Sequence, residues 1–165
     1  MLLNIDPILT GRLLMALDEM GHGDAVVVAD AHFTASKLAR KTLIDMPGLP
    51  APRILAAIRS VMIPDNIADY VQIEAARFVL PKPDGVADEA PSVDLMRSPE
   101  PELLPVQREL ADAAQVSPDA VRLIERFAFY DLAAQAELII RSGETRTYGN
   151  ALLRKGVTPV SEPRS

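Results

Sequence analysis

Five consecutive apolar residues, Ala25–Ala29, constrain the fold of this chain more than any other segment. A run of this length and composition predicts a buried strand. A helix with leucines at helical spacing is predicted directly before it, from residue 7 or 8 to residue 19, with Asp6 as its N-cap. Gly21 is expected to end this helix in a left-handed conformation. A buried strand directly after an amphipathic helix favours a layered domain in which helices cover a sheet.

The alternation of apolar runs with helical patterns continues along the chain. Further strands are expected at residues 42–45, 70–77, 121–126, 136–141 and 150–154, and further helices at residues 52–62, 102–114 and 131–135. Strands that alternate with helices are typical of an α/β layered domain. The length of 165 residues suits one domain covering residues 1–165, large enough to bury about 70% of its unfolded surface.

One segment, residues 81–105, differs from the rest because it holds six prolines and six acidic residues. Little of its first part is expected to form a packed element, so we interpret it as an exposed excursion that the surface tolerates. The polar tail, about residues 160–165, is expected to fray. Neither segment carries a functional assignment from the sequence.

The composition argues against several classes of function. The net charge of −6 is unsuited to nucleic-acid binding, because phosphate recognition needs a basic surface. No apolar run approaches the roughly 18 residues of a membrane-spanning helix, and the first residues do not resemble a signal peptide. The chain has no cysteine, which excludes disulfides and is compatible with a cytoplasmic location. Its two histidines argue against a His-rich metal centre.

Polar side chains gather in four segments where an apolar run meets a turn, at residues 21–24, 30–33, 126–130 and 147–150. Strand ends are where α/β sheets present ligand-binding groups. His22 lies between two glycines, which allow the backbone to approach a ligand closely. A histidine can exchange protons near neutral pH, so this segment is a candidate for acid–base chemistry.

Each segment also has a purely structural explanation. His22 could cap the preceding helix, and Asp30 could cap the turn after its strand. Arg126 could pair with neighbouring acids on the surface. Residues 148–150 could form a hairpin turn, and the aromatic side chains near Arg126 could belong to the core. Taken singly, none of the four segments identifies a function.

Together, and in this order, the four segments resemble the ribose pyranase/fucose mutarotase (RbsD/FucU) family. The resemblance is specific because several motifs match over nearly the whole chain, except the excursion and the tail. The sequence RFAFY at residues 126–130 is similar to the fucose branch rather than the ribose branch. The matching segments are residues 2–10, 19–24, 29–33, 124–130, 143–150 and 152–159.

The resemblance implies a single three-layer α/β/α domain with a central mixed sheet. It also implies a sugar mutarotase, acting on L-fucose, that needs no cofactor and no metal and forms a homo-oligomeric ring, often a decamer, with sites near subunit contacts. By position, the resemblance makes His22 the proton donor. It assigns sugar binding to Asp30, Arg126, Tyr148, Gly149 and Asn150.

Anomer interconversion explains these residue types. The sugar ring opens when one proton reaches the ring oxygen and another leaves the anomeric hydroxyl; the carbonyl then rotates and the ring closes from its other face. A histidine suits the proton donation, while carboxylate and guanidinium groups bind sugar hydroxyls. A water molecule and Tyr148 are both candidates for the base. His32 either orients Asp30, lines the pocket or has a structural role only.

Two features leave the function open at this stage. Thr34 stands where the family often has a proline after His-Phe, and the excursion at 81–105 is longer than usual, which puts sugar preference and assembly in doubt. The same pocket would also serve a non-catalytic sugar-binding accessory protein of a sugar transport or catabolic system. In such a protein His22 would have no role in turnover.

Overall fold

The computed structural model describes residues 2–65, 93–117 and 121–157, and these residues build a six-stranded mixed sheet in the order β2-β5-β1-β6-β3-β4. The strands are β1 (Ala25–Ala29), β2 (Thr42–Met46), β3 (Val93–Met96), β4 (Val121–Ile124), β5 (Leu138–Ser142) and β6 (Ala151–Arg154). Strand β6 is antiparallel to its neighbours β1 and β3, and the other paired strands are parallel. The predicted α/β class with a central mixed sheet is confirmed.

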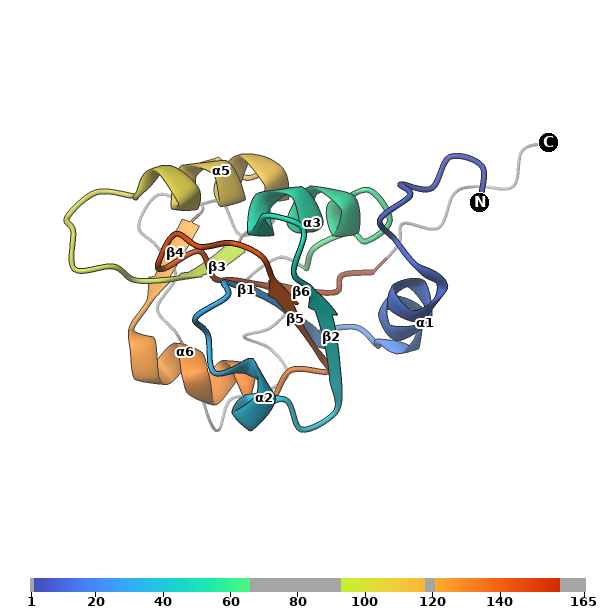
Figure 1. Cartoon of the computed structure of the whole chain (residues 1–165), viewed down its shortest axis with the longest axis horizontal. Helices are drawn as coiled ribbons and strands as arrows, with labels where there is room; N and C mark the ends of the chain where they lie inside the picture. Colours follow the sequence, from blue (N-terminus) through green and yellow to red (C-terminus); the bar gives the residue numbers. More distant parts are fainter. Residues whose placement is uncertain (1, 66–92, 118–120, 158–165) are drawn as a thin grey trace.

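Helices lie on both faces of the sheet (Figure 1). They are α1 (Gly11–Glu19), α2 (Ala35–Leu38), α3 (Ala51–Arg59), α5 (Pro105–Ala114) and α6 (Arg126–Ala133). Helices α3 and α5 cover one face, and α2 and α6 cover the other. None of the helices in the described ranges is long and apolar enough to cross a membrane.

Strand β1 contributes to the core on both faces of the sheet. Val26 and Val28 belong to the apolar cluster under α1, α3 and α5, whereas Val27 and Ala29 belong to the cluster under α2 and α6. The three valines are completely buried, and each such side chain contributes about 1.5–3 kcal/mol to folding. The apolar run that predicted a buried strand therefore fixes the strand around which both layers pack.

The ends of α1 differ from the expected ones. Thr10 is the N-cap, and its hydroxyl accepts a hydrogen bond from the Leu13 N–H at 3.3 Å. Asp6 instead accepts from the Ile8 N–H in a turn before the helix, at 3.1 Å. The left-handed glycine after the helix is Gly23, with φ of 82°, and not Gly21. Both differences arise because a turn at residues 6–9 precedes the helix and a second turn at residues 22–23 follows it, so the helix begins later than its apolar pattern.

Strand β3 lies inside the stretch that was expected to be a surface excursion, so that interpretation is wrong for residues 93–96. Val93 and Leu95 pack into the core, and Asp94 is buried between two arginines. Arg122 donates to both carboxylate oxygens of Asp94 at 2.6 and 2.8 Å, and Arg154 donates at 2.7 Å. Burial alone would raise the pKa of Asp94, but the two guanidiniums hold it below its usual value.

Other sequence predictions had mixed outcomes. The strand predicted at 121–126 ends at Ile124, because Glu125 accepts hydrogen bonds from the N–H groups of Phe127 and Ala128 and so caps α6. The helix expected at 102–114 is present as α5. The strand predicted at 70–77, the first part of the excursion and the tail at 160–165 lie outside the described residues.

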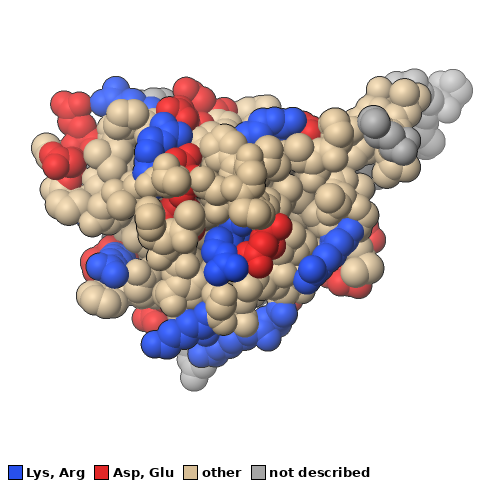
Figure 2. Space-filling model, in the orientation of Figure 1, with Lys and Arg blue, Asp and Glu red and all other residues tan. Residues whose placement is uncertain are grey.

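Basic and acidic side chains are interspersed over the face seen in Figure 2.

Candidate active site

A small cavity of about 180 Å³ opens at one end of the sheet. It lies at the carboxyl ends of β1, β3 and β4 and at the amino end of β6, the edge at which open α/β sheets bind ligands. This volume is below the roughly 300–1,000 Å³ of drug-sized pockets, so the cavity suits a small ligand. Its lining residues are Asp30, His32, Phe33, Met96, Arg126, Tyr130, Thr147, Tyr148 and Asn150.

Asp30 and Asn150 form a reciprocal pair at the base of the cavity. The Asn150 amide Nδ2 donates to Asp30 Oδ2 at 2.7 Å, and the Asp30 backbone N–H donates to Asn150 Oδ1 at 2.9 Å. Both residues are buried. Burial raises the pKa of the Asp30 carboxyl, and the hydrogen bonds from Asn150 and the His32 N–H oppose this rise. The pair joins two segments that are 120 residues apart in the chain.

Arg126 begins α6 and lies at the rim of the cavity. Its Nε donates to the Tyr130 hydroxyl at 3.0 Å, and its guanidinium carbon is 5.5 Å from the centre of the Tyr130 ring. Arg126 is therefore held in place by the Tyr130 side chain and not by an ion pair with a neighbouring acid. Stacked on an aromatic ring, an exposed guanidinium keeps donors free to point at a ligand.

Tyr148 reaches the cavity from a strained backbone conformation. Its φ is 62°, in the left-handed region that a tyrosine rarely adopts. The next residue must be glycine, because a Cβ on Gly149 would lie 2.8 Å from Glu144 Cγ and 3.1 Å from the Arg146 carbonyl oxygen. Residues 148–150 are not a hairpin turn, since β1 lies between β5 and β6 in the sheet.

His32 contributes to the cavity in two ways. Its backbone N–H donates to Asp30 Oδ1 at 3.0 Å, so the backbone and not the imidazole orients the carboxylate. Its imidazole Nε2 lies 3.1 Å from the Thr145 carbonyl oxygen and so links the 30–33 segment to the loop before β6. His32 is both a lining residue and a contact between the two polar segments.

His22 is not in this cavity. It precedes β1, whereas Asp30 follows it, and the five residues of β1, at about 3.3 Å each, span roughly 17 Å between the two ends of the strand. Instead, His22 Nε2 lies 3.2 Å from Asp65 Oδ1, and the imidazole side chain is 36% exposed while that of Asp65 is 5% exposed. Sequence analysis missed Asp65, because no local motif marks a residue that meets His22 from 43 positions away.

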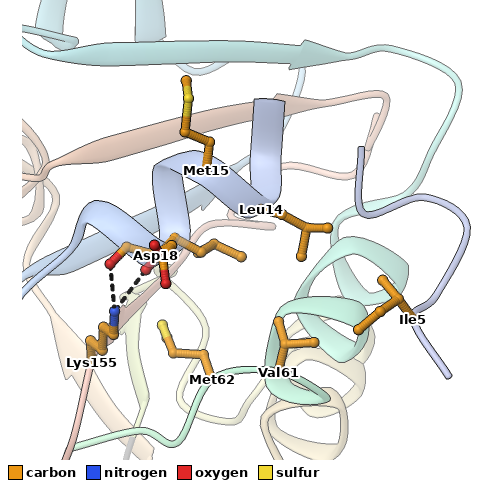
Figure 3. A pocket seen from close by; sticks show the side chains of 8 residues that line it. Ile5, Leu14, Met15, Asp18, Val61, Met62 and Lys155 are labelled. Atoms are coloured by element: carbon orange, nitrogen blue, oxygen red, sulfur yellow. Dashed lines mark hydrogen bonds between the residues drawn. The ribbon is translucent and has the colours of Figure 1, made fainter. Parts of the chain in front are cut away.

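The turn that carries His22 is held from several sides. The Lys155 ammonium donates to the carbonyl oxygens of Leu17 and Asp18 near the end of α1 (Figure 3). It also donates to the carbonyl oxygen of Met20. Asp24 Oδ2 accepts from the Gly21 N–H at 2.7 Å. Lys155, and not His22, therefore caps α1, which leaves the imidazole available to Asp65. Asp24 therefore caps the turn that carries His22.

A second hollow lies next to this turn. Its volume is about 540 Å³, and Ile5, Leu14, Val61 and Met62 border it, with Lys155 at one end (Figure 3). Its lining is mainly aliphatic, so it lacks the group of convergent donors and acceptors found around Asp30. In the described ranges, no three His, Asp or Glu side chains gather in a way that would hold a metal ion.

Comparison with known proteins places the chain in a family. Residues 3–158 match the model of the RbsD / FucU transport protein family. The chain belongs to this family. It is 38% identical over 162 residues to an L-fucose mutarotase of Glaesserella parasuis, a match that covers 97% of this chain and 98% of that protein.

Solved structures of RbsD/FucU proteins share the fold. FucU of Bifidobacterium longum is 31% identical, with a TM-score of 0.72 and coverage of 94% of this chain and 99% of that one. A fucose mutarotase of Streptococcus pneumoniae, solved with L-fucose, is 26% identical, with a TM-score of 0.71 and coverage of 96% and 100%. The resemblance inferred from the sequence motifs is therefore confirmed.

The structure divides the predicted site residues of this RbsD/FucU protein into two groups. Asp30, His32, Arg126, Tyr148 and Asn150 line one cavity, with Gly149 directly behind them. His22 lies at the opposite end of β1. Met96 joins the cavity from β3, and sequence analysis missed it because it lies in the stretch interpreted as a surface excursion.

Proposed function

We propose that this protein is a cofactor-free monosaccharide mutarotase that interconverts the anomers of L-fucose. The observation that carries the proposal is the buried Asp30–Asn150 pair in a monosaccharide-sized cavity. Full-length similarity to an L-fucose mutarotase supports the choice of reaction and of sugar. The apolar part of the cavity wall, Phe33 and Met96, suits a sugar that carries a methyl group.

Each lining group has a role that follows from its chemistry. The Asp30 carboxylate accepts hydrogen bonds from sugar hydroxyls, and its partner Asn150 holds it in place. Arg126 donates to sugar oxygens from the rim. Tyr148 supplies a neutral hydroxyl, and the Gly149 backbone lets the loop close onto the site. These groups bind and orient the sugar without themselves donating a proton to the ring oxygen.

His22 is the proposed proton donor. The imidazole of His22 gives a proton to the ring oxygen, and the bond between that oxygen and the anomeric carbon breaks. The anomeric hydroxyl passes its proton to the base, for which a water molecule and Tyr148 are the candidates, as a carbonyl forms. The carbonyl rotates, the freed hydroxyl attacks its other face, and the protons return. Asp65 holds the imidazole in position through its 3.2 Å contact with Nε2, as a carboxylate orients a catalytic histidine.

This role requires a second subunit. A separation of roughly 17 Å along β1 is too large for His22 and Asp30 of one chain to touch the same sugar. We propose that the His22 end of one subunit meets the Asp30 cavity of its neighbour. Contacts between two different surfaces generate a ring when the rotation closes. A homo-oligomeric ring, up to a decamer, operating in the cytoplasm is thus part of the proposal.

A second candidate function is a non-catalytic sugar-binding accessory protein. The observation that favours it is that one chain holds a binding cavity without the histidine. Nuclear magnetic resonance separates the two functions, because saturation transfer measures exchange between the α and β anomer signals of a sugar.

The decisive test adds the protein to equilibrated L-fucose, with ribose, galactose and rhamnose as comparison sugars. We expect faster anomer exchange for L-fucose than for the other three. Binding of L-fucose without faster exchange would support the accessory function and contradict the mutarotase. Faster exchange of another sugar alone would keep the reaction and change the substrate.

A further inference from the structure

We infer that Arg146, clamped by Glu109 of α5, is a positioning residue that holds the sugar-binding loop in its active shape. This inference rests on the proposed function. It concerns a residue outside the cavity, so it adds a determinant of sugar affinity that the cavity itself does not show. The loop in question runs from Glu144 to Asn150 and carries Tyr148.

The Arg146 guanidinium is held on two sides by carboxylates. Its NH1 and NH2 groups donate to the two oxygens of Glu109 at 2.7 and 2.8 Å. Its Nε and NH2 groups donate to the two oxygens of Glu144, both at 2.9 Å. Paired, parallel hydrogen bonds of this kind fix the plane of a guanidinium as well as its position. The start of the loop is thereby tied to α5.

Glu144 connects this clamp to the Asp30 segment. Its carboxylate also accepts a hydrogen bond from the Arg146 backbone N–H at 3.0 Å, and its carbonyl oxygen accepts one from the Ala31 N–H at 2.8 Å. Glu144 is buried, at 4% exposure. A buried carboxylate requires a charged partner, and Arg146 supplies it. The hydrogen bonds of the clamp therefore extend through Glu144 to Ala31, the residue next to Asp30.

The strain in the loop is the second, independent observation. Tyr148 is left-handed and lies two residues after Arg146, and the Gly149 backbone is pressed against Glu144 and the Arg146 carbonyl. A strained residue keeps its conformation only where its surroundings fix it from several directions. Removing the clamp relaxes this segment, and the Tyr148 hydroxyl then leaves its place in the cavity.

The effect of removing Glu109, which leaves the Arg146–Glu144 pair in place, is expected on binding rather than on overall stability. Glu109 and Arg146 have side chains that are 49% and 44% exposed, and exposed ion pairs contribute little to folding. Neither lines the cavity. Loss of the clamp therefore raises KM for L-fucose while leaving kcat, which depends on His22, near its original value.

The test compares Glu109→Gln with Glu102→Gln. Glu102 also pairs with an arginine, Arg108 at 3.0 Å, but lies outside the clamp, so both variants remove one charge from an exposed pair. Misplacement of binding groups by about 1 Å can cost about 100-fold. We expect Glu109→Gln to raise KM about 3- to 10-fold and Arg146→Met about 10- to 100-fold, with kcat within about twofold. Glu102→Gln is expected to match the wild type.

Arg146→Lys keeps the charge but loses the paired hydrogen bonds, so its KM is expected to lie between those of the wild type and Arg146→Met. Unchanged KM in Glu109→Gln and Arg146→Met would overturn the inference, as would an equal effect in Glu102→Gln. If Arg146→Met does not fold, Glu109→Gln decides. If the wild-type protein binds L-fucose without accelerating anomer exchange, the proposed mutarotase function is contradicted but the role of Arg146 is not. The same variants, compared by their calorimetric Kd for L-fucose, would then test the clamp.

Discussion

The two ends of strand β1 are built differently. At its carboxyl end, Asp30 is 3% exposed and paired with Asn150, and the surrounding side chains enclose a cavity. At its amino end, the His22 side chain is 36% exposed and faces outward with Asp65 behind it. One end holds the proposed sugar-binding groups without His22, and the other holds His22 away from those groups. Under the proposed function, binding and proton transfer are therefore assembled from two subunits.

The largest effect is expected at the amino end. His22→Ala removes the proposed proton donor, and general acid catalysis is typically worth about 10²- to 10⁴-fold, so kcat for L-fucose should fall by that factor. Sugar binding depends on the other end of β1, so the calorimetric Kd should change little. Saturation transfer and calorimetry measure the two quantities. An unchanged exchange rate would show that His22 is not the donor.

A substitution at the carboxyl end should have the opposite signature. Asp30→Asn removes a charged acceptor of hydrogen bonds, and such bonds are worth about 1.5–3 kcal/mol, so KM should rise about 10- to 100-fold. The matched control is Asp45→Asn, which removes an exposed carboxylate that pairs with Arg141. A fall in kcat with an unchanged KM in Asp30→Asn would contradict the division between the two ends.

The fall of kcat/KM at acid pH is expected to come from Asp30, at the carboxyl end of β1. Burial raises the pKa of Asp30, so its carboxylate becomes protonated at a higher pH than an exposed aspartate. The folded state thus holds this proton more tightly than the unfolded state, so the cost of Asp30 to stability is absent below the unfolded-state pKa and grows as pH rises through the raised pKa. As pH falls through that pKa, kcat/KM should decrease. The Asp30→Asn variant should lose this acid limb, and a persisting limb would assign it to another group.

The smallest effect is expected from the support of the His22 turn. Lys155→Met leaves three carbonyl oxygens at the end of α1 without their donor, which should lower the free energy of unfolding by about 1–2 kcal/mol. It should also lower kcat severalfold without changing KM. Lys41→Met, which removes an exposed ion pair with Glu137, is the control. Denaturant unfolding and exchange kinetics check both expectations, and a larger change in KM than in kcat would be inconsistent with them.

Local patterns predicted the parts of the molecule that local forces determine. The apolar run at 25–29 and the polar segments at strand ends identified β1 and most of the cavity, because burial and turn chemistry act over a few residues. The burial of Asp94 was not predicted, because its partners Arg122 and Arg154 come from other strands. Asp65 was not predicted as a site residue for the same reason, since it contacts His22 from 43 positions away. Motifs also grouped His22 with Asp30, although β1 holds them apart.

The most direct test of the central claim is complementation between two inactive subunits. His22→Ala and Asp30→Asn chains with different tags are co-expressed, and assemblies that carry both tags are purified. In a ring built from unlike surfaces, random mixing gives roughly a quarter of the interfaces an intact His22 from one subunit and an intact Asp30 cavity from its neighbour. Recovery of about a quarter of the wild-type exchange rate on L-fucose is the predicted result. Mixed assemblies as inactive as their parents, or full activity in a monomeric protein, would contradict the account.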